Sequence, residues 1–382
     1  MLTTQHNPFS SRMAAISESK TTRVFTLAQQ LRRQGKDIIS LAVGEPDFET
    51  PQAVIRATRQ ALEAQATRYG PVSGIDALRA LLSQEFPGYG PDNIIITNGA
   101  KQALYTLFQM LCNPGDEVIL PQPCWVSFTE QIKLAGGCPV AVTTVDHQID
   151  PQTIEDAVTD KTRAILINTP NNPTGAVYSK AALTHVAAIA EKHDIYLISD
   201  DAYHVMTFDD HPHVGLFDVV ADQDRVITVR SFSKHYNMTG FRLGYMAAHP
   251  SIIKGMAKLQ SHISGNVCTF AQYGALAALE MDQSIVEQRR LVLENRRDIA
   301  YELTRSLFDC VKPQGAFYLF PNVTSHLKKS ETSENLAMRL LDKAGVAVVP
   351  GEAFGGAGHI RISFGANEAD LRAAFERIQK EL

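Results

Sequence analysis

The 382-residue sequence is poor in cysteine and has no excess of positive charge. Its 5 cysteines are an odd number without a C-x-x-C pair, which argues against a disulfide framework and against a paired-cysteine zinc site. The 36 Lys and Arg residues face 41 Asp and Glu residues, giving a formal net charge of −5. Overall charge therefore gives no reason to expect nucleic acid or an anionic membrane as a partner.

Long apolar runs are also missing. The longest have about five to seven residues, whereas a helix needs roughly 20 to cross a bilayer. The N-terminus lacks the charged and apolar regions of a secretion signal. These absences, with the cysteine count, predict a cytoplasmic protein. What is present is a globular composition with 45% hydrophobic and 20% charged residues, enough for a large core.

Short apolar runs alternate with helix-compatible stretches before residue 250. The runs at 117–120, 164–167, 195–198 and 226–229 are apolar almost throughout, which is typical of parallel strands covered on both faces. Between them, apolar residues recur at helical spacing from Ala100 to Leu111. We expect an α/β fold with a mostly parallel central sheet and helices on both faces.

The pattern changes beyond about residue 250 and predicts a second, small α+β unit. Helical stretches are expected at 251–264, 269–308, 332–344 and 367–381, and strands near 316–320, 346–349 and 359–364. A further helical stretch at 24–34 fits the same unit.

Polar side chains follow three of the central strands, at the edge where open parallel sheets bind ligands. They are Asn172 after the run at 164–167, Asp200 and Tyr203 after 195–198, and Ser231, Ser233, Lys234 and Arg242 after 226–229. The sequence has no G-x-G-x-x-G after a strand, no P-loop and no H-E-x-x-H to suggest another cofactor. A lysine among phosphate-type ligands indicates an aldehyde cofactor, pyridoxal phosphate.

Each chemical need of that cofactor has a candidate. Lys234 supplies the amine that reacts with the aldehyde, and Asp200 pairs with the ring nitrogen. Tyr203 and Asn172 donate to the phenolate oxygen. The phosphate is expected to bind to Ser231, Ser233, Arg242 and the start of the helix that opens with Gly99, Ala100 and Lys101. Trp125, the only tryptophan, is a candidate to stack on the ring.

Other readings of single residues are weaker. Asp201 is the neighbour most easily confused with Asp200, but the spacing to Tyr203 favours Asp200. Two aspartates and two histidines over 209–213 could suggest a metal site, yet a third ligand at suitable spacing is missing and a solvated loop is expected. We therefore expect no metal. Cys124 is expected to be a small residue of the pocket wall.

The motifs together resemble the fold-type I, class I aminotransferases of the aspartate aminotransferase family. The resemblance runs from about residue 12 to the C-terminus and is carried by G-E-P-D-F-E-T-P at 44–51, the segment 69–79, P-G-D-E-V at 114–118, N-N-P-T-G at 171–175, S-F-S-K at 231–234 with M-T-G at 238–240 and Arg242, and R-I-S-F at 361–364. It implies a homodimer, a large cofactor-binding domain over 46–290, and a small domain formed by 1–45 and 291–382.

The resemblance also implies roles for residues that spacing alone does not identify. Tyr69 would reach the cofactor phosphate of the partner subunit, Gly44 would offer its backbone to the substrate, and Arg361 would bind the substrate α-carboxylate. Trp125 and Asn172 also belong to the substrate site. In the resembling branch, residues matching Lys101 and Thr21 bind a distal carboxylate.

The resemblance predicts transfer of an amino group from an L-amino acid, with aspartate first, to 2-oxoglutarate by a ping-pong mechanism. Lys234 would move a proton from the substrate Cα to C4′ of the cofactor, as base and then as acid. An aromatic or methionine-type aminotransferase is the alternative within the family, because Lys101 is flexible and Cys124 leaves room. A C–S β-lyase and a DNA-binding regulator are the alternatives from other classes.

Overall fold

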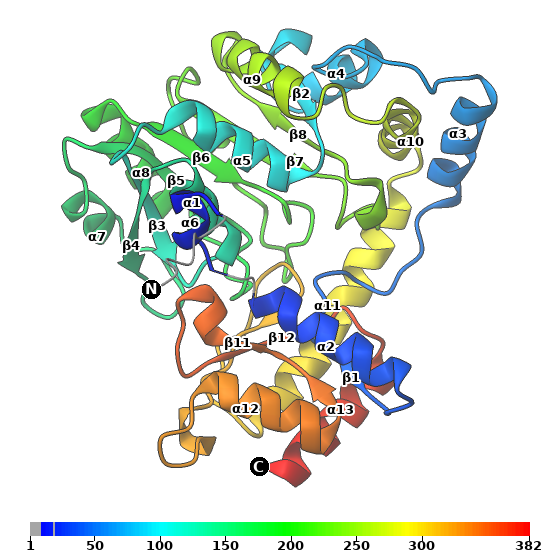
Figure 1. Ribbon diagram of the computed structural model, residues 1–382, viewed down its shortest axis with the longest axis vertical. Helices are drawn as coiled ribbons and strands as arrows, with labels where there is room; N and C mark the ends of the chain where they lie inside the picture. Colours follow the sequence, from blue (N-terminus) through cyan, green and yellow to red (C-terminus); the bar gives the residue numbers. More distant parts are fainter. Residues whose placement is uncertain (1–8, 18–19) are drawn as a thin grey trace, which may run out of the picture.

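The computed structural model describes residues 9–17 and 20–382, and the chain forms two lobes (Figure 1). The largest sheet in the described part of the chain has seven strands in the order β2-β8-β7-β6-β5-β3-β4. Their bounds are β2 (Ile94–Thr97), β3 (Glu117–Gln122), β4 (Cys138–Thr143), β5 (Thr162–Asn168), β6 (Tyr196–Asp200), β7 (Val226–Ser231) and β8 (Gly244–Ala247). β8 runs opposite to the other six strands, which share one direction, so the expected mostly parallel sheet is confirmed.

Helices cover both faces of this sheet, which explains why its strands are apolar without alternation. One face packs against α5 (Ala100–Leu111), α6 (Val126–Leu134) and α9 (Pro250–Ile263). The other packs against α4 (Asp76–Ser83), α8 (Lys180–His193) and α10 (Thr269–Glu280), beside α3 (Gln52–Glu63). In β5, for example, Ile165 and Ile167 join the second core and Leu166 the first. The short α7 (Pro151–Asp156) contacts α8.

The lower lobe in Figure 1 is assembled from both parts of the chain that flank the sheet. Strand β1 (Ile39–Ser40) pairs in parallel with β10 (Val346–Ala347), and β11 (Val349–Pro350), β12 (Ile360–Ser363) and β9 (Tyr318–Leu319) form a three-stranded antiparallel sheet. Its helices are α2 (Lys20–Arg33), α11 (Ser284–Arg305), α12 (Ser333–Arg339), which continues as a π-helix over Leu340–Ala344, and α13 (Glu368–Glu381). The short α1 (Ser11–Ala14) contacts α6 of the upper lobe.

Two expectations about elements need correction. The helical stretch at 269–308 is two helices, because the chain becomes extended at Met281 and Asp282 accepts from the Ser284 N–H at 2.9 Å, starting α11 anew. The strand near 316–320 shortens to β9. Helix α11 runs from the upper lobe to the lower one (Figure 1), and the domain bounds 46–290 against 1–45 and 291–382 stay a prediction.

Among the described residues, no helix combines the length and the apolar character required to cross a membrane.

Candidate active site

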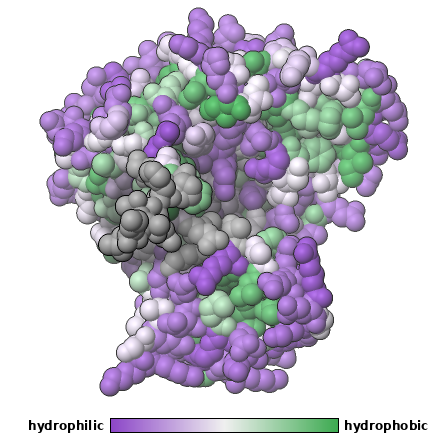
Figure 2. Space-filling view, viewed as in Figure 1, coloured by the Kyte–Doolittle hydropathy of each residue, from purple (hydrophilic) through white to green (hydrophobic). Residues whose placement is uncertain are grey.

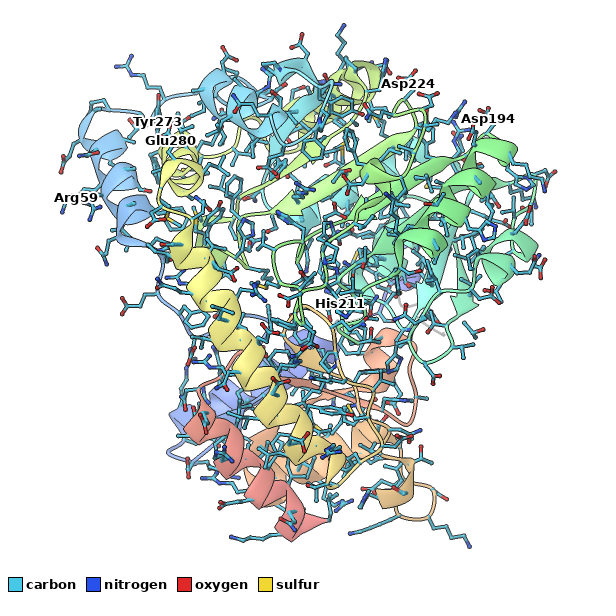
Figure 3. All side chains as sticks on the ribbon, turned by 180° about the vertical axis from the view of Figure 1, so that it is seen from behind. Arg59, Asp194, His211, Asp224, Tyr273 and Glu280 are labelled. Carbon is cyan, nitrogen blue, oxygen red and sulfur yellow. The ribbon has the colours of Figure 1, made fainter. Side chains whose placement is uncertain are left out.

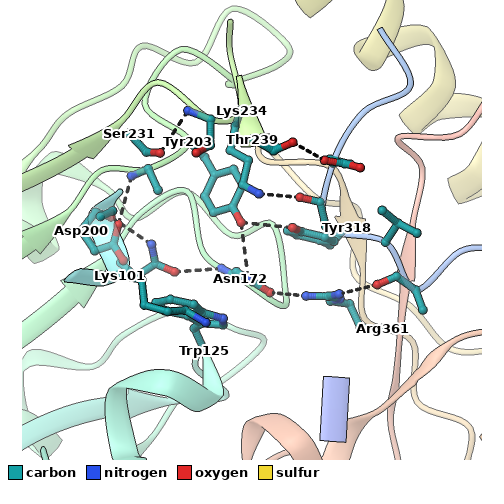
Figure 4. Close-up of a pocket in the computed structure, with 18 of the residues that line it drawn as sticks. Lys101, Trp125, Asn172, Asp200, Tyr203, Ser231, Lys234, Thr239, Tyr318 and Arg361 are labelled. Atoms are coloured by element: carbon teal, nitrogen blue, oxygen red, sulfur yellow. Dashed lines mark hydrogen bonds between the residues drawn. The ribbon is translucent and has the colours of Figure 1, made fainter. Parts of the chain in front are cut away.

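A cavity of about 410 Å³ lies where the carboxyl ends of β5, β6 and β7 face the small lobe (Figure 4). Most of the predicted site residues line it. They are Gly44, Ala100, Lys101, Trp125, Asn172, Asp200, Tyr203, Ser231, Ser233, Lys234, Arg242 and Arg361. The strand-end rule therefore brings together residues that are far apart in the sequence.

Lys234 lies at the centre of this cavity, three residues after the end of β7. Its Nζ donates to the Gly44 carbonyl at 2.5 Å, so the side chain reaches from the sheet to the opposite wall. Loss of hydration lowers the pKa of Lys234 to about 8; the positive charges of Arg361 and Arg242 act in the same direction, while Glu45 opposes them. The amine of Lys234 therefore gives up its proton more readily than that of an ordinary lysine.

The two consecutive aspartates at the end of β6 have different environments. Asp200 is buried, lines the cavity and accepts from the Ala202 N–H at 3.1 Å. Burial raises the pKa of Asp200 to about 7, and the nearby charge of Asp201 adds to the effect. A cation bound beside this carboxyl would lower its pKa again and favour the ionised form.

Asp201 points out of the cavity. Its Oδ2 lies 3.5 Å from both His213 Nε2 and Arg230 Nη2, and its Oδ1 accepts from Ser199 Oγ at 2.7 Å. Although burial alone would raise it, His213 and Arg230 hold the pKa of Asp201 below its ordinary value. Only the first of the two aspartates lines the cavity, and the pairing of Asp200 with the ring nitrogen stays a prediction.

Arg361 is held on the other wall by both lobes. Its Nη1 donates to Asn172 Oδ1 and its Nη2 donates to the Ala42 carbonyl, each at 3.0 Å. The guanidinium carbon lies 4.4 Å from the ring centroid of Tyr318 and 5.1 Å from that of Phe354. Its buried Nε has no acceptor among the described residues. This arrangement fixes a cation that can still bind a carboxylate.

A concave corner suited to a phosphate lies beside Ser231, Ser233 and Arg242. Gly99 has φ +76°, and a Cβ there would lie 2.7 Å from Arg242 Nη2, so a side chain at this position would displace the guanidinium. Gly99 also precedes α5, whose first N–H groups have no acceptor within the helix. Gly99 therefore contributes by leaving space for Arg242, although it does not itself line the cavity.

Lys101 and Trp125 form the side of the cavity near α5 and α6. Lys101 Nζ lies 5.0 Å from the centroid of the Trp125 ring. Burial lowers the pKa of Lys101, and the charge of Arg242 lowers it further. A negative group bound near Lys101 would offset both effects.

Besides Gly99, two more predicted residues are absent from the lining of this cavity. Tyr69 is 99% exposed and does not contact the cavity of its own subunit. The side chain of Thr21 lies outside the described residues. Cys124 belongs to the apolar core formed with α5 and α6, where burial raises the pKa of its thiol to about 12, so the expectation that it lines the pocket wall is wrong.

Residues 209–212 are exposed, as expected of a solvated loop, but both ends of the stretch 209–213 are anchored to the protein. Asp209 accepts from both terminal nitrogens of the buried Arg297, at 2.7 and 2.8 Å, and His213 turns inward to Asp201. In the parts of the chain with described positions, no group of three or more His, Cys, Asp or Glu side chains could hold a metal ion.

Several lining residues were not predicted from the sequence. They are Phe25, Ala42, Val43, Glu45, Asn168, Ala202, Thr239 and Tyr318. Asn168 is the last residue of β5, so the strand-end rule could have identified it. Ala42 contributes a backbone oxygen, and Tyr318 lies in a two-residue strand without a motif; neither carries a sequence signal.

Comparison with known proteins supports the resemblance seen in the motifs. The family model "Aminotransferase class I and II" matches residues 36–378. An aspartate aminotransferase from Geobacillus stearothermophilus is 38% identical over 97% of both chains, and an aspartate/prephenate aminotransferase from Thermus thermophilus is 40% identical over 98% of both.

A solved structure points the same way. Aspartate aminotransferase from Thermus thermophilus with maleate has a TM-score of 0.94 to this chain at 39% identity, covering 99% of this chain and 100% of that one. The expected family and fold type are thereby confirmed. This chain belongs to the class I and II aminotransferases, a family of pyridoxal-phosphate-dependent enzymes.

Proposed function

We propose that this aminotransferase binds pyridoxal phosphate in the cavity and transfers an amino group from aspartate to 2-oxoglutarate. The observation that carries the proposal is the position of Lys234, whose amine lies in one cavity with the buried carboxyl of Asp200 and the anchored cation of Arg361. The amine suits the cofactor's aldehyde, the carboxyl suits its ring nitrogen, and the guanidinium suits a substrate carboxylate.

The donor set fits the cofactor. A buried carboxyl with a raised pKa is expected to bind a protonated ring nitrogen, which is the role we assign to Asp200. Arg242, in the space that Gly99 leaves, would bind the phosphate with Ser231, Ser233 and the first N–H groups of α5, at Ala100 and Lys101. Tyr203 and Asn172 would bind the phenolate oxygen. When bound, the cofactor supplies an aldehyde and a ring that stabilises negative charge at the substrate Cα.

Lys234 is then the residue that moves the proton. Its Nζ is already desolvated and beside other cations, so the neutral amine is accessible near neutral pH. We assign to it removal of the proton from the substrate Cα and its return at C4′ of the cofactor. The Gly44 carbonyl, which accepts from Nζ at 2.5 Å, holds the free amine before it reacts with the aldehyde.

A dicarboxylate fits the cations of the substrate site. Arg361 would bind the α-carboxylate and Lys101 the distal one, with Trp125 packing beside them and Thr21 assisting. Maleate in the related Thermus structure is also a dicarboxylate, which agrees with this pairing. Burial removes hydration from the Lys101 ammonium and so lowers its pKa, and a bound distal carboxylate would offset this loss.

A second substrate class is favoured by Phe25 of α2, which lines the cavity and is exposed. An apolar ring at this position suits an aromatic amino acid, and some relatives are named aspartate/prephenate aminotransferases. We therefore propose that aromatic substrates are accepted in addition to aspartate.

A homodimer accounts for an apolar edge of the upper lobe. Ile55, Leu62 and Tyr273 are 43, 40 and 40% exposed on α3 and α10, and hydrophobic side chains gather on this edge in Figure 2. Figure 3 shows Arg59 and Tyr273 on the two neighbouring helices. Thr269 Oγ1 at the start of α10 donates to the Arg68 carbonyl at 3.2 Å, fixing the segment that carries the exposed Tyr69.

We assign this edge to the subunit interface, with Tyr69 reaching the cofactor phosphate of the partner subunit. We also propose the domain division 46–290 against 1–45 and 291–382, and a cytoplasmic location, which agrees with the five free cysteines of the described chain.

The proposed reaction is tested by half-reactions of the cofactor-loaded protein. Each amino acid is added alone, and the visible absorption of the bound cofactor is followed. We expect aspartate and glutamate to give the fastest change and phenylalanine a slower one. An unchanged spectrum with every amino acid would refute the transfer reaction. Release of pyruvate from cystathionine without an oxo acid would instead identify a C–S β-lyase.

Lys101→Ala tests the dicarboxylate assignment. Removing a partly buried cation that pairs with the distal carboxylate should lower kcat/KM for aspartate about 100-fold and that for phenylalanine less than about threefold. Lys258→Ala, an exposed lysine on α9, is the matched control. An equal loss for both substrates would contradict the assignment of Lys101.

A further inference from the structure

Tyr318 occupies the junction between the two walls of the cavity, and the motifs did not identify it. The residue is 1% exposed and begins β9, which pairs with β12 so that Tyr318 lies opposite Ser363. Arg361 is two residues from Ser363 on β12, on the same face of the sheet, close enough for a diagonal contact. The small lobe therefore fixes the relative positions of Tyr318 and Arg361.

The hydroxyl of Tyr318 contacts the hydroxyl of Tyr203 across the lobes. The two oxygens are 3.1 Å apart, and Asn172 Nδ2 lies 3.4 Å from the Tyr203 oxygen (Figure 4). A phenol has one proton and two acceptor sites. If Asn172 and Tyr318 both donate to the Tyr203 oxygen, its own proton is left free to point into the cavity.

The ring of Tyr318 acts on a different partner. The guanidinium of Arg361 lies over it at 4.4 Å and has Phe354 at 5.1 Å as a second aromatic neighbour. A desolvated guanidinium is attracted by an aromatic face, and this attraction does not depend on the phenolic hydroxyl. The ring and the hydroxyl thus serve separate contacts.

Tyr318 also packs beside the backbone that binds Lys234. A Cβ at Gly44 would lie 3.3 Å from the Tyr318 hydroxyl, and the Gly44 carbonyl accepts from Lys234 Nζ at 2.5 Å. The Gly44 backbone, the Tyr203 hydroxyl and the Arg361 guanidinium therefore all approach this one side chain.

We propose that Tyr318 is a positioning residue with two separable roles: its hydroxyl directs the Tyr203 proton toward the cofactor, and its ring holds Arg361 in place for the substrate carboxylate. The inference rests on the proposed function, since it assigns Tyr203 to the cofactor and Arg361 to the substrate. Loss of the donor to Tyr203 weakens Tyr203 as a donor in turn, because linked hydrogen bonds polarise one another.

Tyr318→Phe removes the hydroxyl and keeps the ring. The pH midpoint of the visible band of the lysine-bound cofactor should rise by about half a unit, because a weaker donor at the phenolate oxygen stabilises the deprotonated form less. The dissociation constant of maleate, a non-reacting dicarboxylate, should stay within about twofold of wild type. Tyr245→Phe is the control, since it removes a buried hydroxyl that donates to Glu85 Oε2 at 2.8 Å away from the cavity.

Tyr318→Leu removes both groups. It should show the same spectral shift and, in addition, weaken maleate binding about tenfold because Arg361 loses its aromatic support. An unmoved midpoint in Tyr318→Phe overturns the hydroxyl role. Equal maleate affinity in the Phe and Leu variants overturns the ring role. Should Tyr318→Leu not fold, a loss of maleate affinity in Tyr318→Phe comparable to tenfold would still contradict the separation.

The wild-type protein distinguishes this inference from the proposed function. If wild type shows no cofactor band and no half-reaction with aspartate, the proposed function fails before Tyr318 is tested. If wild type reacts and the Tyr318 variants behave like Tyr245→Phe, only the inference about Tyr318 fails.

Discussion

The two walls of the cavity are built differently. On the sheet wall, the functional groups are side chains that follow parallel strands. The register that pairs Asn168 with Asp200 also fixes the relative positions of these side chains along the strand direction. On the small-lobe wall, backbone oxygens of Ala42 and Gly44 and aromatic rings position the cations. The sheet wall is therefore suited to a resident cofactor, whereas the other wall, made from segments distant in sequence, is suited to an exchanging substrate.

The largest loss of activity is expected when Lys234 is replaced, because its side chain reaches from the sheet wall to the small-lobe wall. Lys234→Ala removes the amine to which we assign the reaction with the aldehyde and the proton transfer, so kcat should fall by about 10⁴-fold or more. The visible band of the lysine-bound cofactor should disappear, as measured by absorption spectroscopy. Lys258→Ala should leave both unchanged. A variant that retained the band would show that another amine holds the cofactor.

The next largest effect is expected at Arg361, where substrate binding and cofactor binding should respond differently. Arg361→Lys keeps the charge but cannot hold Asn172, Ala42 and a carboxylate together, since a lysine ammonium lacks the planar fork of arginine. KM for aspartate should rise about 100-fold, whereas cofactor affinity, measured by equilibrium dialysis, should change by less than about threefold. Arg305→Lys on the exposed face of α11 is the control. A comparable loss of cofactor affinity would contradict the division between the walls.

The different construction of the two walls also explains how much of the site could be predicted from the sequence. Asp200, Tyr203 and Lys234 follow apolar strands, so local patterning locates them and parallel pairing brings them together. The contacts of Arg361 with the Ala42 carbonyl and of Tyr318 with Tyr203 depend on how the small lobe docks, which no local pattern encodes. The inward turn of His213 and the core position of Cys124 were missed because side-chain direction at a loop or helix start is set by tertiary packing.

A smaller effect is expected from pH and tests the sheet wall alone. In the cofactor-free protein the pKa of Asp200 is raised from 3.8 to about 7, so between about pH 4 and pH 7 the folded state holds a proton that the unfolded chain has released. This group's contribution to stability therefore falls as pH rises through that window and is constant above it.

Asp200→Asn should remove this slope. The cofactor-free variant should match wild type near pH 4 and be more stable at pH 7, by about 4 kcal/mol at most. Chemical denaturation at a series of pH values measures the difference. Asp201→Asn should have the opposite sign at pH 7, because His213 and Arg230 lower the pKa of Asp201 and stabilise its charge. Equal slopes in wild type and Asp200→Asn would contradict the raised pKa.

The smallest effect is expected at the edge of the small-lobe wall. Phe25→Ala removes an exposed ring that lines the cavity, and should raise KM for phenylalanine about three- to tenfold while changing KM for aspartate less than about twofold. Steady-state kinetics with both substrates checks this. Phe9→Ala, an exposed ring elsewhere on the chain, serves as the comparison.

The pairing of β1 with β10 has a consequence for how the protein is made. The Ile39 N–H donates to the Gly345 carbonyl at 2.8 Å. Because β10 is synthesised about 300 residues after β1, β1 cannot pair until nearly the whole chain has been made. The seven-stranded sheet is complete by Ala247 and can form on the ribosome first. Arg361 is translated near the end of the chain. A nascent or truncated chain can therefore possess the sheet wall and its lysine while still lacking the guanidinium to which we assign substrate binding. On that assignment, catalytic activity requires the last segment of the chain.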